Sequence, residues 1–192
     1  MILVGITGSI GCGKTTIANV IREQGYTVFD IDKWVKFLYY KKDFLKTIKS
    51  TFPECFISGG FNKRCLRNIV FSDNDKLKVL EGIIHPLLKS RIKKTIRINN
   101  ENNSIVFMDV ALLFEMGWDK YCDYIILADV DKNIQKNRVI NRDGISEEDF
   151  YKIDKIQMSQ DEKRKMVDFI IDTDVNYNKL RVKIINILME LE

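Results

Sequence analysis

The chain has 192 residues, 45% of them hydrophobic and 30% charged, which suits one globular domain that can bury a sizeable core. Its 31 basic and 27 acidic residues leave a net charge of +4, which suits an anionic ligand but does not by itself indicate nucleic acid. The four cysteines have no CxxC spacing and the sequence contains a single histidine, which argues against a zinc site and a disulfide framework. No apolar run reaches the about 18 residues of a membrane helix. We therefore expect a cytoplasmic protein with reduced thiols and without a membrane partner.

The N-terminal segment predicts a strand followed by a phosphate-binding loop. Residues 2–7 (ILVGIT) form a short apolar run that ends in glycine, as a buried parallel strand does. The segment Gly8–Thr15 matches the pattern G-x-x-x-x-G-K-[ST], and from Thr16 the apolar residues follow a helical period that stops at Gly25. A strand before this pattern and a helix after it are the context that a P-loop requires.

The P-loop predicts where a nucleoside triphosphate binds. Its backbone N–H groups and the positive end of the following helix would bind phosphate oxygens. Lys14 would contact the β- and γ-phosphates, and the hydroxyl of Thr15 would ligate Mg²⁺. Cys12 is expected to contribute little beyond its backbone. The expected ATP-binding residues of the loop are Gly8, Ser9, Ile10, Gly11, Cys12, Gly13, Lys14, Thr15 and Thr16.

Four further strands are predicted from short apolar runs, and an aspartate follows each of the first three. The runs are Tyr26–Phe29, Ser104–Met108, Tyr124–Ala128 and the weaker Phe169–Ile171. A helical or turn pattern follows each run. This βα alternation predicts an α/β fold, with a five-stranded parallel sheet between helices on both faces.

Three aspartates are candidates for the chemistry of phosphoryl transfer. Asp30 and Asp32 close the second strand, and Asp109 closes the third. Ligands of open α/β sheets bind at the carboxyl ends of the strands, so these carboxylates are expected at the same cleft as Lys14. One would deprotonate the acceptor hydroxyl, and another would hold Mg²⁺, Asp109 through a water molecule. The structural alternative for a single aspartate after a strand is a helix N-cap.

The interval 33–103 carries no strand signal and is interpreted as a helical insertion beside the sheet, where a second substrate could bind. It contains a basic helical stretch, Leu77–Ile98, and breaks at Phe52-Pro53 and at 58–60. A shorter segment, 142–164, includes a helix start with the pattern of a capping box at Ser146–Asp149. The last helix places five apolar residues on one stripe and is expected to pack in the core: Leu180, Ile184, Ile187, Leu188 and Leu191.

Arg138 and Arg142 are four residues apart and therefore share one face of a helix. Beside a phosphate cleft, two guanidinium groups can clamp the transferring oxygens and shield the reaction from water. A solvated basic face is the structural alternative. The single histidine, His85, fits a substrate contact or a packing role equally well.

The chain resembles the dephospho-CoA kinase family nearly end to end, from Gly5 to about Asp172. The P-loop is shared by very many NTPases, whereas the other matching segments are far more particular. In the family's order these are VFDIDKWVK (28–36), CLRNIVF (65–71), IIHPLL (83–88), FMDVALLFE (107–115), NRVINRD (137–143) and IDKIQMS (153–159).

The resemblance implies a Mg²⁺- and ATP-dependent transfer of the γ-phosphoryl group to the ribose 3′-hydroxyl of dephospho-CoA, the last step of coenzyme A synthesis. It implies one P-loop kinase domain over 1–192, in which 33–103 binds CoA and 142–164 is a lid. Asp32 matches the catalytic base, with Asp30 beside it, and Arg138 and Arg142 match lid arginines that act with Lys14. Gln157 matches a lid-helix residue near the nucleotide. The implied acceptor-site positions are Arg67, His85, Leu113, Phe114 and Glu115, and the implied metal positions are Thr15, Asp32 and Asp109.

Three positions depart from the family pattern. Lys36 stands where arginine or histidine is frequent, and Ala111 stands where proline is usual. Thr173 replaces an asparagine on the adenine side of the site.

Other functions are weighed against this one. A nucleoside or nucleoside-monophosphate kinase is the alternative, because it shares the P-loop, the helical insertion and the lid. The chain lacks an NKxD element and a DxxG element after Asp109, which argues against a GTPase-type switch. A nucleic-acid-binding module would show a steep salt dependence of affinity. We expect ATP and dephospho-CoA as partners, no nucleic acid, and a monomer with an oligomer left open.

Overall fold

The computed structural model describes residues 2–57, 60–99 and 105–192, and its chain divides into two compact units. Unit 1 comprises Met1–Ile31 and Asn102–Glu192, and unit 2 comprises Asp32–Glu101. Among the helices of the described ranges, none combines the length and the apolar character that a bilayer-spanning helix needs.

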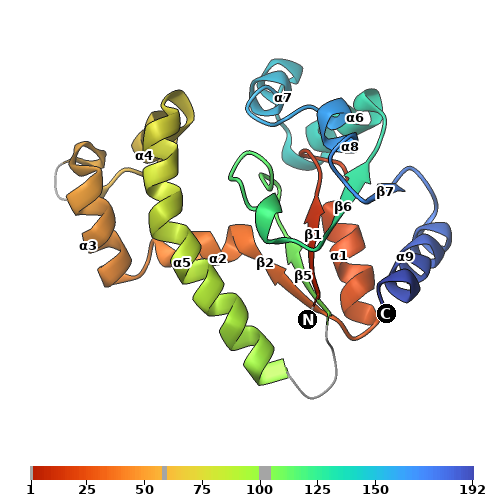
Figure 1. The fold of residues 1–192 in the computed structure, drawn as a ribbon. Helices are drawn as coiled ribbons and strands as arrows, with labels where there is room; N and C mark the ends of the chain where they lie inside the picture. Colours follow the sequence, from red (N-terminus) through yellow and green to blue (C-terminus); the bar gives the residue numbers. More distant parts are fainter. Residues whose placement is uncertain (1, 58–59, 100–104) are drawn as a thin grey trace. The chain divides into compact units, whose positions relative to one another are not determined.

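Unit 1 contains the five-stranded parallel sheet that the sequence predicts (Figure 1). The strand order is β2-β5-β1-β6-β7, with β1 (Ile2–Thr7), β2 (Thr27–Asp30), β5 (Ile105–Asp109), β6 (Tyr124–Asp129) and β7 (Phe169–Asp172). The second strand begins one residue later than expected, and Ser104, the expected start of the third, lies outside the described residues. The central strand β1 is flanked by β5 and β6, so it is buried, and this explains its continuous apolar run.

One face of the sheet is covered by the helices α1 (Lys14–Glu23) and α9 (Tyr177–Leu191), which lie side by side (Figure 1). Alternate strand residues such as Val4, Ile6 and Phe107 point to this face and form a core with both helices. The prediction for the last helix is confirmed, because Leu180, Ile184, Leu188 and Leu191 are buried and Ile187 packs against them partly buried.

On the other face, the segment that follows β5 packs directly against the backbone of β1. A Cβ atom added to Gly5 would lie 2.9 Å from the Sγ of Cys122 and 3.2 Å from the Cδ2 of Leu113. Any larger residue at position 5 would therefore displace this segment.

Three helices lie between β6 and β7 in unit 1: α6 (Lys132–Asp143), α7 (Glu147–Asp154) and α8 (Gln160–Arg164). Helix α7 starts as predicted, since the Ser146 side chain accepts a hydrogen bond from the Asp149 N–H. A complete capping box lies one helix further on, between Ser159 and Glu162. The role of this region as a lid stays a prediction.

Unit 2 is mainly helical. Its elements are α2 (Ile31–Leu38), α3 (Lys42–Thr51), the 3-10 helix η1 (Pro53–Cys55), β3 (Phe56–Ile57), β4 (Gly60–Phe61), α4 (Lys63–Ser72) and α5 (Asn74–Asn99). Helix α2 begins at Ile31, the last residue of the first segment of unit 1.

The expectation of no strand in this interval was wrong, because β3 and β4 form an antiparallel hairpin. Two-residue strands are too short to show a period of two in the sequence. Ring contacts stabilise the hairpin: Phe56 packs on its cross-strand partner Phe61, and Tyr39 from outside the hairpin stacks on Phe61.

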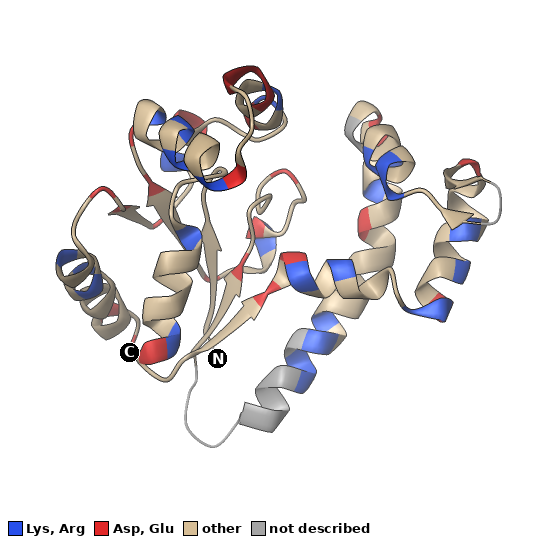
Figure 2. Cartoon of the chain, turned by 180° about the vertical axis from the view of Figure 1, so that it is seen from behind, with Lys and Arg blue, Asp and Glu red and all other residues tan. Residues whose placement is uncertain are grey.

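The charge of the chain is divided unevenly between the two units. Residues 32–101 carry 16 basic and 7 acidic side chains, a net +9, so the remaining residues carry a net −5. Figure 2 shows basic residues along α3 and α5. The small net charge of +4 for the whole chain is therefore the sum of a strongly basic unit 2 and an acidic remainder.

Candidate active site

The P-loop connects β1 to α1 and depends on glycine at three positions. Gly8, Gly11 and Gly13 have φ angles of 148°, 80° and 85°, a region that favours glycine. Helix α1 then begins at Lys14 and has no acidic residue in its first turn. The N–H groups of a first turn lack intrahelical partners, so this helix end presents unneutralised positive potential to a ligand.

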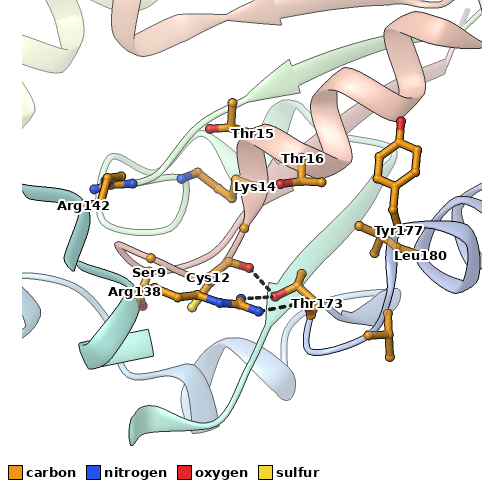
Figure 3. A pocket seen from close by; sticks show the side chains of 13 residues that line it. Ser9, Cys12, Lys14, Thr15, Thr16, Arg138, Arg142, Thr173, Tyr177 and Leu180 are labelled. Atoms are coloured by element: carbon orange, nitrogen blue, oxygen red, sulfur yellow. Dashed lines mark hydrogen bonds between the residues drawn. The ribbon is translucent and has the colours of Figure 1, made fainter. Parts of the chain in front are cut away.

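A cavity of about 590 Å³ lies at this helix end (Figure 3). Nine of the predicted site residues line it: Ser9, Gly11, Cys12, Gly13, Lys14, Thr15, Thr16, Arg138 and Arg142. Four residues from the region after β7 complete the wall, and of these the sequence connected only Thr173 with the site: Thr173, Val175, Tyr177 and Leu180. Both arginines therefore line the same cavity as Lys14, and their four-residue spacing puts them on the same face of one helix.

The two arginines of α6 are held differently. Arg138 donates from Nη1 to the Thr173 hydroxyl (2.9 Å) and from Nη2 to the Thr173 carbonyl (3.0 Å). Arg142 donates from Nε and Nη2 to the two carboxylate oxygens of Asp143, both at 2.7 Å. This contact raises the pKa of Arg142 and lowers the pKa of Asp143. Arg142 is exposed, so it can exchange Asp143 for a phosphate oxygen at little cost.

Three glutamine side chains hold the backbone of the P-loop. Gln157 accepts a hydrogen bond from the Ile10 N–H (2.9 Å), and it lies between α7 and α8 rather than on a helix. Gln160 accepts from the Ser9 N–H (3.3 Å) and donates to the Ala128 carbonyl (3.1 Å). The buried Gln135 donates to the Ile10 carbonyl (2.7 Å). Sequence reasoning missed Gln135 and Gln160, since an isolated glutamine on a helix carries no pattern.

A buried ion pair joins the LLFE segment to α8. The Lys163 Nζ is fully buried and lies 3.2 Å from the Glu115 Oε1, which also accepts a hydrogen bond from the Met158 N–H (2.6 Å). Burial lowers the pKa of Lys163, and the charge of Glu115 opposes this shift. The neighbouring Leu113 and Phe114 side chains are buried. The acceptor-site role of these three LLFE residues stays a prediction, and Lys163 is a residue that the sequence did not single out.

Two candidate carboxylates lie at the ends of neighbouring strands. Asp30 closes β2, Asp109 closes β5, and the two are register partners. Asp109 also pairs with Ile6 of β1, the strand that leads into the P-loop. Carboxylate oxygens and the hydroxyl of Thr15 are hard donors of the kind that Mg²⁺ prefers. Neither aspartate lines the cavity that Thr15 lines, so a shared metal site stays a prediction.

The remaining predicted residues belong to unit 2. Asp32 lies in the first turn of α2, Arg67 is exposed on α4, and His85 is half-buried on α5 directly before Pro86. Helices α4 and α5 pack against each other within this unit.

The thiol of Cys12 is poorly suited to chemistry. Burial, together with the charge of Asp129, raises its pKa from 9.0 to about 11. The thiolate is the reactive form, so at pH 8 we expect iodoacetamide to label Cys12 about 100-fold more slowly than an ordinary thiol. Mass spectrometry of the labelled peptide would measure this, with the urea-unfolded chain as the reference. Equal rates in the two states would contradict the prediction.

Known proteins resemble this chain over nearly its full length. A family model described as dephospho-CoA kinase matches residues 2–179. The chain is 36% identical over 192 residues to the dephospho-CoA kinase of Bartonella henselae, covering 100% of this chain and 98% of the relative. A crystal structure from Thermus thermophilus superposes with a TM-score of 0.82 at 31% identity, covering 100% of this chain and 98% of that one. A dephospho-CoA kinase structure from Campylobacter jejuni gives 0.61 at 25% identity, with coverage of 98% and 96%. The chain therefore belongs to the dephospho-CoA kinase family.

Proposed function

We propose that the chain binds the triphosphate of ATP on its P-loop and transfers the γ-phosphoryl group to the ribose 3′-hydroxyl of dephospho-CoA, the last step of coenzyme A synthesis. The observation that carries this proposal is the cavity at the N-terminus of α1, which Lys14, Thr15, Arg138 and Arg142 all line. A positive helix end, a lysine and two arginines suit a ligand with several negative phosphate oxygens. The two sides of the reaction are supported by different parts of the chain.

On the donor side, residues 8–16 and Gln157 would hold the nucleotide, and Gln157 would act through the Ile10 backbone that it contacts. Thr15, Asp109 and Asp32 would hold Mg²⁺, which neutralises charge on the β- and γ-phosphates when bound. Lys14, Arg138 and Arg142 would then stabilise the charge on the transferring oxygens. In-line phosphoryl transfer needs little covalent help, so positioning and electrostatics supply most of the barrier reduction.

On the acceptor side, Asp32 would accept the proton of the 3′-hydroxyl, with Asp30 two residues before it. Arg67, His85 and the segment Leu113–Glu115 would contact dephospho-CoA. Support comes from the net charge of +9 in residues 32–101, because a basic surface attracts an anionic substrate. The proposal needs no nucleic acid, no membrane and no second subunit, and it places the reaction in the cytoplasm, where thiols stay reduced.

A coupled assay of ADP release tests the proposed function. We expect rapid ADP formation with MgATP and dephospho-CoA, and only slow release when the acceptor is omitted. EDTA should abolish the reaction, and excess Mg²⁺ should restore it. Phosphorylation of a nucleoside or a nucleoside monophosphate, but not of dephospho-CoA, would overturn the acceptor assignment.

The basic unit 2 makes a separate prediction about salt. Raising NaCl from about 0.05 M to about 0.3 M shortens the screening length by roughly half, so the KM for dephospho-CoA should rise several-fold. Initial rates at saturating MgATP would measure this, and potassium glutamate at matched ionic strength would control for specific effects of chloride. A KM that does not change with salt would contradict an electrostatic role for residues 32–101.

A further inference from the structure

We infer that Thr173 is a positioning residue of the donor site, where it holds the Cys12–Gly13 peptide of the P-loop and the Arg138 guanidinium in one fixed arrangement. Thr173 follows β7 and is 7% exposed. Its N–H donates to the Asp129 carbonyl (2.9 Å), which continues the pairing of β6 with β7 by one residue. The backbone of Thr173 is therefore fixed to the sheet.

The hydroxyl of Thr173 contacts two groups of opposite character, as Figure 3 shows. Its Oγ1 lies 2.9 Å from the Cys12 carbonyl oxygen and 2.9 Å from the Arg138 Nη1. A guanidinium can only donate, so the hydroxyl oxygen accepts from Arg138 and its single proton goes to the Cys12 carbonyl. Only a side chain that both donates and accepts can make these two contacts.

The contact with Cys12 sets the direction of a backbone N–H group in the P-loop. In a trans peptide the C=O and the N–H point in opposite directions, so fixing the Cys12 carbonyl directs the Gly13 N–H away from Thr173. A Cβ added to Gly13 would lie 3.1 Å from the Thr173 side chain, which shows how closely the two residues meet. Gly13 directly precedes α1, where N–H groups are expected to bind phosphate.

The contact with Arg138 fixes the plane of its guanidinium. Two nitrogens bind the hydroxyl and the carbonyl of Thr173, and two-point binding determines an orientation that a single bond leaves open. The Asp174 carboxylate is 3.6 Å from Arg138 but more than half exposed, so it adds little. The hydroxyl of Thr173 thus contacts both the phosphate-binding loop and the arginine.

The test is the isosteric variant Thr173→Val, with Thr173→Ser as the rescue. This inference rests on the proposal that ATP phosphates bind the P-loop, and calorimetric binding of MgATP to the wild-type chain tests that proposal first. We expect Thr173→Val to lower kcat/KM for ATP by about 10- to 100-fold, because two contacts of a buried hydroxyl are lost. The KM for dephospho-CoA should stay within about twofold, and Thr173→Ser should recover to within about threefold of wild type.

Thr7→Val is a matched control in the same unit. The Thr7 hydroxyl is buried and has no hydrogen-bond partner among the described residues, so the same substitution there should leave the kinetics unchanged. A Thr173→Val variant with wild-type ATP kinetics would overturn the inference. So would equal impairment of the valine and serine variants, because packing rather than the hydroxyl would then be responsible.

A double-mutant cycle separates the two contacts. If Thr173 acts partly through Arg138, Thr173→Val should cost at least about threefold less in an Arg138→Ala background than in the wild type. Fully additive effects would overturn the Arg138 part of the inference. If Thr173→Val does not fold by circular dichroism, Thr173→Ala makes the same comparison, because it also removes the hydroxyl and leaves a smaller side chain. If wild type itself does not bind MgATP, the donor-site proposal and this inference are both overturned.

Discussion

Replacing Asp32 with asparagine is expected to lower kcat by about 10²- to 10⁴-fold, the usual contribution of a positioned general base. Asparagine has nearly the same size and keeps one oxygen that can face Mg²⁺, but it cannot take a proton from the acceptor hydroxyl. Binding of MgATP should therefore stay within about threefold of wild type. The coupled assay would give kcat, and calorimetry would give the affinity for MgATP.

Asp43→Asn is a matched control for this variant. Asp43 occupies the second position of α3, as Asp32 occupies the second position of α2, and both side chains are exposed in unit 2. Both variants therefore lose a carboxylate in the first turn of a helix, whereas only Asp32→Asn loses the proposed proton acceptor. Unchanged turnover in Asp32→Asn would remove Asp32 from the role of base.

The second large effect is expected on stability. Lys163→Met should lower the free energy of unfolding by about 3–5 kcal/mol, because it leaves the Glu115 carboxylate buried without its cation. Lys163 is fully buried, and only 12% of the Glu115 side chain is exposed. Urea unfolding followed by circular dichroism would measure the loss.

Two further variants show whether the ion pair is the cause. Lys165→Met changes an exposed lysine just after α8 and should cost no more than about 0.5 kcal/mol. In the double variant Glu115→Gln, Lys163→Met, the amide oxygen can still accept the Met158 N–H while the buried charge is gone, so most of the stability should return. A single Lys163→Met variant as stable as wild type would show that the pair contributes nothing.

The sequence predicted those parts of the protein that depend on local pattern. The apolar run of residues 2–7, the glycine spacing of the P-loop and the last helical stripe each report a structure formed by neighbouring residues. The four-residue spacing of Arg138 and Arg142 predicted a shared helix face for the same reason, because one helix carries both side chains.

The parts that could not be predicted depend on contacts between residues far apart in the chain. Gln160 reaches Ser9 across 151 positions, and Thr173 reaches Cys12 across 161. Lys163 looks like a surface lysine in a short charged helix, and only the fold shows that Glu115 faces it. The β3–β4 hairpin was missed because its strands have two residues each.

The glutamine contacts of the P-loop have a consequence for the entropy of nucleotide binding. Side chains of Gln157 and Gln160 already occupy the N–H groups of Ile10 and Ser9, and Gln135 occupies the Ile10 carbonyl. The first half of the loop is thus ordered when the chain folds, so less conformational freedom remains to be lost when a triphosphate arrives. Because Gln157 and Gln160 flank the start of α8, a displacement of that helix would loosen the loop, and nucleotide affinity would fall without any change in a residue that touches phosphate.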